Sequence, residues 1–504
     1  MRVLVTGGTG VVGEAAVSEL VSRGHEVRLL SRHAGEGVAR WADGVSAWPA
    51  SVTDEGDVTG SADGQEVVLH LTGIVAEDPP ESTFERVNIG GTRNMLREAE
   101  RAGVARFIYI SSLGADRGKS EYHQSKRAAE DLVREFGGTW TILRPGNVYG
   151  PGDEIVSLVL NMVRTLPVMP VIDSGDDRFQ PVWVDDLARV IGDTVERSDL
   201  SGKVLDLTGP DETSTNDLLD RFRVLTDQEP VRLRVPGVVA GIVSAAAEKI
   251  GVAFPVNAGQ LTMLREESVI SNPESNAIGT VFDFKPTSLN EGLRKLCDAQ
   301  PEQLPNSGTG TLERKRIWAD ISGSKLTPEE LFECFRRNFN EATPHVVDAE
   351  AEPGTRCDLQ AGGTITMSLP LRGNVQVRVE SLTDRSATLT TLRGHPLAGA
   401  VRFLAEQRGD SVRFEIQIFD RAASLPDWLA MKVGGDSLQT RTWTRLAERM
   451  VELSGGAAPN GVEHDNEDLD DDQADLIEAW LRDLVLKRKR EADESGEEMV
   501  MVRG

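Results

Sequence analysis

The sequence predicts an α/β protein, with a doubly wound parallel sheet and a small helical lobe in the N-terminal half and a smaller α+β domain after it. Strand-like and helix-like runs alternate over residues 1–210. A glycine-rich turn follows the first expected strand, in the segment VLVTGGTGVVG at residues 3–13. Residues 298–310 have the Pro, Gln, Ser and Gly content of a linker, and shorter alternating runs follow them.

The expected parallel strands are short apolar runs, and the helices between them carry apolar residues at helical spacing. The strands are Arg2–Thr6, Glu26–Ser31, Glu66–Leu71, Arg106–Ser111 and Thr139–Leu143. The helices are Gly13–Arg23, Phe84–Ala102 and Tyr122–Phe136. Together they predict one domain over residues 1–297, whose pattern from about residue 211 turns mostly helical and indicates a substrate-side lobe.

Residues 311–455 are expected to form the second domain, an antiparallel sheet around one long helix. The strands are Leu312–Ile321, Thr364–Leu369, Asn374–Glu380, Ala387–Leu392, Val401–Ala405 and Val412–Phe419. Helices are expected at Thr327–Asn340 and from Pro426 to about Leu453. This order is typical of a helix-grip fold. Its interior is either a cavity for an apolar ligand or a filled core, and the sequence leaves both open.

Residues 456–504 are expected to be an acidic tail that contains an amphipathic helix at residues 474–490. The apolar stripe of this helix includes Leu476, Trp480 and Leu481. Two interpretations stay open. The helix either docks on its own chain, or it forms a homodimer or binds a protein partner.

Composition excludes several classes of function. The net charge of −26 argues against binding to nucleic acid or to anionic lipid surfaces. Cys297, Cys334 and Cys357 have no paired spacing, and no metal-ligand cluster is evident, so neither a disulfide framework nor a metal site is expected. The longest apolar stretch, Val238–Ala247, is too short to span a bilayer. With a strand beginning almost at the first residue, the expected location is the cytoplasm.

The glycine-rich turn predicts a dinucleotide site. Gly7 permits a tight turn, Gly10 lets the backbone approach a pyrophosphate, and Gly13 allows the helix to pack closely on the strand. The N–H groups at the start of that helix, which include those of Val11 and Val12, form an anion site.

The end of the second strand indicates which dinucleotide is bound. An NAD(H) site usually places a carboxylate there, which would repel a 2′-phosphate. Here the strand ends with Ser31 and Arg32, a hydroxyl and a guanidinium, which suit a 2′-phosphate. The expected cofactor is therefore NADP(H) in preference to NAD(H).

A phenol and an ammonium lie four residues apart on one expected helix face, at Tyr122 and Lys126. Tyrosine can relay a proton to or from a carbinol if the neighbouring ammonium lowers the pKa of the phenol. Ser111 and Ser112, at the end of the preceding strand, offer a hydroxyl for the substrate oxygen. These residues are the candidate catalytic group.

The glycine-rich turn and the segment YHQSK at residues 122–126 together resemble the short-chain dehydrogenase/reductase superfamily, in its extended or atypical branch. The resemblance implies a Rossmann-type NAD(P)-binding fold and adds Asn88, in VNIGGT, to the catalytic group. It places four residues of the loop after the sixth strand beside the nicotinamide: Pro145, Gly146, Asn147 and Val148. Three residues at the end of the expected strand Glu66–Leu71 and directly after it are also expected to bind the cofactor: Leu71, Thr72 and Gly73.

Two further resemblances refine the expected function. The segment ISSLGA at residues 110–115 is similar to the subgroup around the 39-kDa accessory subunit of respiratory complex I, whereas sugar-nucleotide epimerases would have a hydroxyl where Leu113 stands. The segment TLRGHPLAGAVRF at residues 391–403 resembles the uncharacterised family DUF1990.

An NADP(H)-dependent oxidoreductase, or an epimerase or dehydratase, is the leading expectation, with a small apolar substrate such as an isoprenoid, quinone or lipid precursor. The alternatives are a nucleotide-binding assembly or sensor protein without turnover, and a sugar-nucleotide epimerase.

Overall fold

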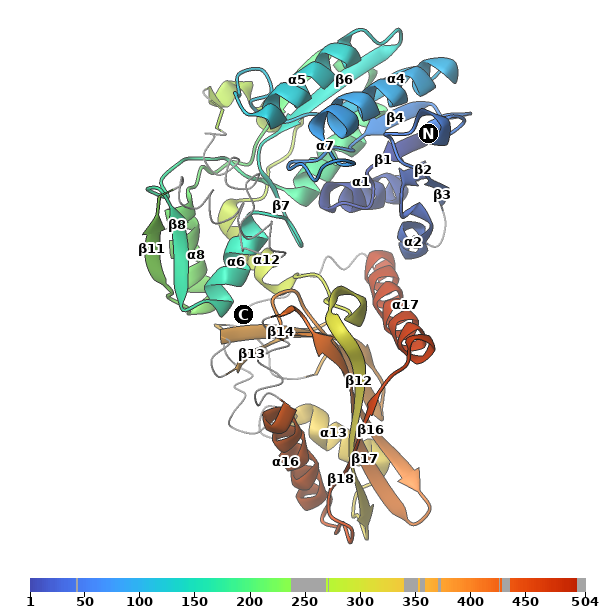
Figure 1. Cartoon of the computed structure of the whole chain (residues 1–504), viewed down its shortest axis with the longest axis vertical. Coiled ribbons are helices and arrows are strands. Elements are labelled where there is room, and N and C mark those ends of the chain that lie inside the picture. The colour runs from blue at the N-terminus through green and yellow to red at the C-terminus, as the bar shows by residue number, and fades with distance from the viewer. Residues whose placement is uncertain are drawn as a thin grey trace. The chain divides into compact units, whose positions relative to one another are not determined.

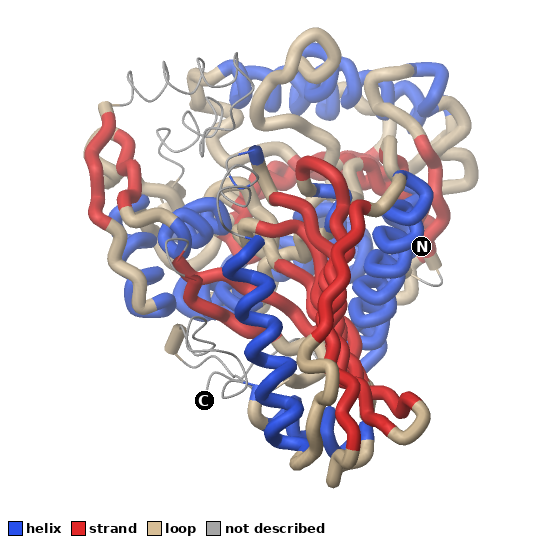
Figure 2. The backbone as a smooth tube through the Cα atoms, turned by 60° about the horizontal axis from the view of Figure 1, so that its bottom comes forward, coloured by secondary structure: helices blue, strands red, loops and turns tan. Residues whose placement is uncertain are grey.

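The computed structural model describes residues 1–41, 44–236, 269–270, 272–339, 352–353, 359–369, 373–425, 427 and 436–495. The chain divides into two compact units. The first comprises Met1–Val159, Val168–Arg221 and Val231–Leu296, and the second Leu160–Pro167, Phe222–Pro230 and Cys297–Gly504. Each unit contains one seven-stranded sheet, which can be followed in Figures 1 and 2.

The sheet of the first unit is parallel throughout and has the order β10-β6-β5-β4-β1-β2-β3. Its strands are β1 (Arg2–Thr6), β2 (Glu26–Ser31), β3 (Val45–Pro49), β4 (Val67–His70), β5 (Arg106–Ile110), β6 (Thr139–Pro145) and β10 (Lys203–Leu207). The order reverses between β1 and β4, which is where doubly wound sheets bind their ligands, beyond the carboxyl ends of the strands. The predicted doubly wound sheet is confirmed.

Helices cover both faces of this sheet (Figure 1). On one face Val3 and Val5 of β1 pack with residues of α1 (Val11–Ser22) and α7 (Val184–Glu196). On the other face Leu4 packs with residues of α4 (Thr92–Arg101) and α5 (Glu121–Arg134). Successive residues of a strand point to opposite faces, so one apolar run supplies both cores. Shorter helical segments are α2 (Ala34–Gly37), η1 (Val38–Arg40), α3 (Glu55–Val58), η2 (Glu85–Gly91) and η3 (Ser198–Leu200).

Residues after β6 add two small parallel sheets as well as helices. β7 (Val148–Tyr149) pairs with β9 (Val182–Trp183), and β8 (Val168–Ile172) pairs with β11 (Val231–Val235). The helical segments are α6 (Val156–Thr165), α8 (Thr215–Thr226), η4 (Pro273–Ser275), α11 (Ala277–Thr280) and α12 (Leu289–Asp298). The lobe expected to be mostly helical thus contains a strand, β11. The apolar stretch Val238–Ala247 lies outside the described residues, and within these no helix is long and apolar enough to cross a membrane.

The sheet of the second unit is antiparallel, in the order β13-β14-β15-β16-β17-β12-β18. Its strands are β12 (Thr309–Ser322), β13 (Thr364–Leu369), β14 (Gly373–Leu382), β15 (Ser386–Thr391), β16 (Leu397–Arg408), β17 (Ser411–Ala422) and β18 (Glu463–Asp468). The separate antiparallel domain predicted from the alternating runs is confirmed. The expected linker precedes it and contains one short helix, η5 (Pro305–Ser307).

One face of this sheet packs against α13 (Pro328–Arg337) and α16 (Asp436–Ser454) through an aromatic cluster. Phe335 of α13 has no exposed surface, and its ring centroid lies 4.8 Å from that of Phe403 and 5.4 Å from that of Phe414. Trp443 of α16 meets Phe403 edge-on at 5.7 Å. The described interior is therefore packed here. Most of residues 426–435, where the long helix was expected to begin, lie outside the described residues.

The segment expected as an acidic tail forms two elements of the second unit. β18 pairs with β12, and α17 (Asp471–Ser495) packs on the sheet face opposite the aromatic cluster. Trp480 of α17 lies with its ring centroid 5.8 Å from that of Phe419, and Leu481 is fully buried. This packing accounts for Trp480 and Leu481 of the apolar stripe, whereas Leu476 is exposed, and it corresponds to the interpretation of a helix that docks on its own chain.

A buried ionic cluster holds α17 in place. Arg488 donates to Glu302 (Nη2–Oε1, 2.7 Å) and to Glu380 (Nε–Oε2, 2.6 Å). Burial opposes the ionisation of Glu302, but the cations of Lys489, Arg378 and Arg488 outweigh it and hold the pKa of Glu302 well below its usual range. The carboxylate thus joins α17 to β14.

A second buried ion pair lies between distant parts of the chain within the same unit. Arg164, in the stretch 160–167, donates to both carboxylate oxygens of Glu352 at 2.8 Å and to the backbone oxygen of Cys297 at 2.9 Å. Gln376 of β14 also accepts a bond from this guanidinium, at 2.9 Å. Residues 160–167 are thereby an integral part of the second unit.

Replacing Phe335 with alanine should lower the free energy of unfolding of the second unit by about 3–5 kcal/mol, because it leaves a cavity within the aromatic cluster. Leu476→Ala is the control: this α17 side chain is 71% exposed, so its change should stay within about 0.5 kcal/mol. Urea unfolding followed by circular dichroism gives both values. Equal effects of the two substitutions would contradict the assignment of Phe335 to the core.

Candidate functional site

The turn between β1 and α1 brings three backbone segments into close contact. Gly7 has a φ of +73°, and a Cβ atom there would lie 2.9 Å from the amide nitrogen of Thr72, after β4. A Cβ on Gly13 would lie 2.2 Å from the carbonyl oxygen of Gly7. By contrast, a Cβ on Gly10 would meet only that same oxygen, at 3.6 Å. The turn is packed tightly on two sides and has space at Gly10, as a bound pyrophosphate requires.

The N-terminus of α1 has the features of an anion site. Gly10 is its N-cap, in an extended conformation, and no side chain caps the helix. The N–H groups of Val11 and Val12 belong to the first turn, where a helix provides no acceptors. Because these donors and the helix dipole favour a phosphate at this position, the residues present fit a dinucleotide.

Ser31 and Arg32, at the end of β2, lie next to the glycine-rich turn. The Ser31 hydroxyl lies 3.2 Å from the Thr9 hydroxyl of the glycine-rich turn. Arg32 is exposed, and within the described part of the chain its guanidinium has no ion-pair partner. A cation next to the turn is thus available to a ligand.

The residues after β4 are held against β1. Leu71 donates its N–H to the Thr6 carbonyl at 3.2 Å, and Thr72 donates its N–H to the Thr6 hydroxyl at 3.4 Å. A Cβ on Gly73 would lie 2.8 Å from the Lys126 Nζ atom. Glycine at position 73 therefore allows the chain to pass over the ammonium.

His70, the last residue of β4, has no exposed surface and lies beneath this region. Its Nδ1 atom is 2.7 Å from the Thr6 hydroxyl, and its Nε2 atom is 3.1 Å from the Thr92 hydroxyl. Burial, together with the charge of Lys126, lowers the pKa of His70 to about 3. The ring is therefore neutral at physiological pH and joins β1 to α4.

Asn88 lies in η2, a π-helical segment in place of the regular helix start expected at Phe84–Ala102. Its amide nitrogen donates to the Ile74 carbonyl at 3.1 Å and to the Ser125 hydroxyl at 2.9 Å. Its amide oxygen accepts the Ile74 N–H at 2.8 Å. Asn88 thus connects the loop after β4 to α5. Wide π turns are frequent at functional sites.

Lys126 of α5 is only 5% exposed. Its ammonium donates to the Ile110 carbonyl at 3.1 Å and lies 5.2 Å from the ring centroid of Tyr109. Burial lowers the pKa of Lys126 to about 8, and the negative charge of Glu130 opposes this shift.

Tyr122, one turn earlier on α5, is half-buried. Burial raises the pKa of its phenol, a hydrogen bond with Ser112 opposes the shift, and the charge of Glu154 adds to it. The lowering of the Tyr122 pKa by Lys126, expected from the spacing, is thus not found. The physical reason is that desolvation of the phenol dominates, while the ammonium contacts Ile110 and Tyr109.

The two candidate serines have different surroundings. Ser111 is buried, and its hydroxyl donates to Glu130 (Oγ–Oε1, 2.6 Å). Ser112 is half-buried; its hydroxyl donates to the Leu113 carbonyl at 3.4 Å, and its interaction with the Tyr122 phenol opposes the rise in the pKa of that group. Ser111 therefore belongs to a buried structural network, and Ser112 is the hydroxyl that faces the phenol.

The loop after β6 lies at the same edge of the sheet. Pro145 accepts the N–H of Leu113, and Gly146 donates its N–H to Leu207, both at 2.8 Å. Asn147 accepts the N–H of Val182 at 3.0 Å, and Val148 begins β7. The candidate residues thus gather beyond the carboxyl ends of the parallel strands. Within the described residues, no group of three or more His, Cys, Asp and Glu side chains could hold a metal ion.

Comparison with known families agrees with this geometry. The family described as NAD(P)H-binding matches residues 7–158, and the domain of unknown function DUF1990 matches residues 332–449. The chain joins an NAD(P)-binding Rossmann domain to a DUF1990 domain.

Three curated relatives illustrate the two parts. A ceramide reductase of Caulobacter vibrioides is 36% identical over 188 residues, which cover 37% of this chain and 58% of the relative. An uncharacterised protein of Mycobacterium tuberculosis is 27% identical over 488 residues, 91% of this chain and 52% of the relative. A 3 beta-hydroxysteroid dehydrogenase/Delta 5-->4-isomerase of that species is 32% identical over 182 residues, 30% of this chain and 48% of the relative. The chain spans about half the length of these relatives.

Sequence reasoning missed three residues that organise the site: His70, Glu130 and Arg144. Each had a signal. His70 lies near the end of the expected strand Glu66–Leu71, Glu130 follows Lys126 by four residues on one helix face, and Arg144 directly follows the expected strand Thr139–Leu143. None belongs to the candidate catalytic group, yet each fixes part of it.

The buried His70 should make the protein sensitive to acid. The unfolded chain binds a proton at this residue below pH 6.5, whereas the native state does not until about pH 3, so stability is lost as the pH falls. This residue alone should cost about 1.4 kcal/mol at pH 5.5 relative to pH 8. In urea unfolding at both pH values, His70→Gln should lose this share of the acid sensitivity and exposed His33→Gln should retain it. If the original protein and both variants lost the same free energy of unfolding between pH 8 and pH 5.5, the prediction would be contradicted.

Proposed function

We propose that the NAD(P)-binding domain is an NADP(H)-dependent oxidoreductase that acts on a hydroxyl or carbonyl group of an apolar substrate. The observation that carries this proposal is the grouping of a hydroxyl, a phenol and an ammonium, from Ser112, Tyr122 and Lys126, beyond the carboxyl ends of β5 and β4. The glycine-rich turn lies at the same edge of the sheet.

The cofactor would be held by groups on three elements. The N–H groups of Val11 and Val12 would bind the pyrophosphate, and Ser31 and Arg32 would bind the 2′-phosphate. The Lys126 ammonium, beneath Gly73, would bind the ribose next to the nicotinamide. The bound nucleotide supplies the hydride donor or acceptor.

The residues of the chain would manage the proton. Ser112 would hydrogen bond the substrate oxygen and hold it at Tyr122. Because burial raises the pKa of Tyr122, the phenol keeps its proton at neutral pH, and it can donate that proton to the oxygen of a carbonyl that is being reduced. Reduction is accordingly the direction that this arrangement favours.

The substrate class is proposed from two sources. The relatives named ceramide reductase and 3 beta-hydroxysteroid dehydrogenase act, by those names, on apolar molecules. The second unit, in addition, has the sheet-and-helix order of a helix-grip fold, although its interior is packed around Phe335. We extend this substrate class to the present chain as a proposal.

A second candidate function is a nucleotide-binding assembly or sensor protein without turnover. The raised pKa of Tyr122 and the contact of Lys126 with a backbone carbonyl favour it, because no pairing with the ammonium activates the phenol. Sugar-nucleotide epimerisation is less favoured, since it would need a hydroxyl at the position of Leu113.

The protein should bind NADPH more tightly than NADH, because the Arg32 guanidinium is available for a 2′-phosphate. Loss of such a charge-assisted contact costs roughly 1.5–3 kcal/mol, or about ten- to a hundredfold in affinity. Arg32→Ala should reduce the preference by that factor when both cofactors are titrated by fluorescence. Arg28→Ala, on the same strand, is the matched control. A preference unchanged in Arg32→Ala would contradict the assignment.

Tyr122→Phe should abolish NADPH oxidation with a panel of long-chain ketones and ketosteroids while leaving cofactor affinity unchanged, because only the proton donor is lost. Lys126→Ala should weaken both, because the ammonium would also bind the ribose. Measured kcat and cofactor Kd separate these effects. If Tyr122→Phe is as active as the original protein, another group donates the proton. If the original protein binds NADPH but turns over no substrate, the binding function is favoured.

A further inference from the structure

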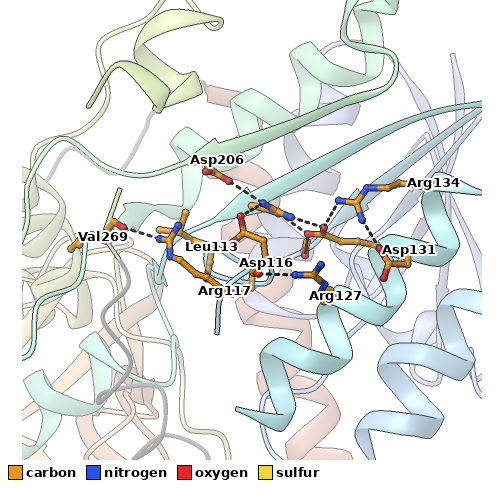
Figure 3. Close-up of polar contacts among 12 residues, drawn as sticks. Leu113, Asp116, Arg117, Arg127, Asp131, Arg134, Asp206 and Val269 are labelled. Carbon is orange, nitrogen blue, oxygen red and sulfur yellow. Dashed lines mark hydrogen bonds and ion pairs between the residues drawn. The ribbon is translucent and has the colours of Figure 1, made fainter. Parts of the chain in front are cut away.

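One carboxylate beside the candidate site, that of Glu130, has no exposed surface. It accepts bonds from Ser111 Oγ at 2.6 Å, from Arg144 Nε and Nη2 at 2.7 Å each, and from Arg134 Nη2 at 2.8 Å. One side chain of α5 thereby joins the ends of β5 and β6. Figure 3 shows Arg134, which also donates to the Asp131 carboxylate at 2.8 Å.

Arg144 extends the network towards Ser112. Its Nη1 atom lies 3.1 Å from the Asp116 carboxylate and 3.9 Å from that of Asp206 on β10. Arg127 of α5 donates to the Asp116 carbonyl at 2.7 Å (Figure 3). The loop that begins with Ser112 is consequently tied to both α5 and β6.

Glu130 also stands one helical turn after Lys126. The other groups around that ammonium are the neutral His70 of β4, the ring of Tyr109 and the carbonyl of Ile110 on β5, and the amide of Asn88 in η2. None of these offers a negative charge. Glu130 is the group whose charge favours the ammonium form of Lys126.

We propose that Glu130 is a positioning residue of the candidate site: it fixes the Ser112 loop through Arg144 and supplies the counter-charge that keeps the buried Lys126 an ammonium. The assignment rests on the proposed function, because it concerns how Lys126 is prepared to bind a ribose. Glu130 would contact neither substrate nor cofactor, and would act only through Arg144 and Lys126.

The test measures the titration of Lys126 in the cofactor-free full chain. Competitive labelling with acetic anhydride, quantified by peptide mass spectrometry over a pH series, gives the midpoint of Lys126, with exposed Lys203 as an internal reference. The midpoint should lie at about pH 8 and should fall by roughly one unit in Glu130→Gln. Glu98→Gln is the matched control. It removes a buried carboxylate of α4 that binds Arg101 and two backbone N–H groups, and it should leave the midpoint unchanged.

A surface substitution keeps the test decisive if Glu130→Gln does not fold. Arg134 is partly exposed and neutralises Glu130 from the outer side, so Arg134→Gln should raise the Lys126 midpoint. Arg97→Gln, which removes an exposed arginine of α4, should not. Glu130→Asp retains the negative charge, so the Lys126 midpoint in this variant should stay close to that of the original protein.

The proposal is overturned if the Lys126 midpoint is unchanged in folded Glu130→Gln. It is also overturned if the Lys126 midpoint does not rise in Arg134→Gln. Cofactor affinity is then measured separately over the same pH range. In the original protein it should weaken as the pH rises through about 8, and in Glu130→Gln it should weaken at lower pH. If NADPH does not bind at all, the proposed function fails, but the labelling result still decides the role of Glu130 towards Lys126.

Discussion

A carboxylate that is removed from water must be met by several donors, and this constraint organises both units. In the first unit Glu130 brings together β6, α5 and the end of β5, because its four hydrogen bonds come from Ser111, Arg144 and Arg134. In the second unit Glu302 does the same for β14 and α17 through Arg378 and Arg488. Apolar packing provides most of the stability of such units. The acidic groups add specific polar contacts between elements that the apolar cores also join.

The apolar patterns predicted most of the strands, because a run of buried residues leaves few other conformations. β1, β2 and β13 have the predicted bounds. β18 was missed for a physical reason: the segment EHDNED has no apolar periodicity. Its pairing depends on backbone hydrogen bonds with β12 and on partners such as Trp318, which donates to Glu463 at 3.0 Å. Acidic residues of an edge strand remain in water, so hydrophobicity cannot reveal them.

The candidate site was predictable in its composition but not in its electrostatics. Spacing along α5 places Tyr122 and Lys126 on one face, yet it does not tell how deeply each is buried, and burial sets the direction of both pKa shifts. Ser111 and Ser112 directly follow β5, and one of the two hydroxyls is taken up by a buried hydrogen-bond network. Which one depends on Glu130, a residue that local patterns do not connect with either. Such contacts are fixed by tertiary packing.

The ion pair of Arg164 and Glu352 has consequences for folding during synthesis and for recombination of the gene. The second unit is built from residues 160–167, 222–230 and 297–504, so two of its pieces interrupt the chain of the first. During synthesis, Arg164 leaves the ribosome long before Glu352, so the ion pair cannot form until residue 352 has been made. A gene cut at residues 298–310 would likewise remove that guanidinium from a domain built around it. Recombination that exchanges the DUF1990 part of this chain at the linker would therefore disrupt a buried ion pair.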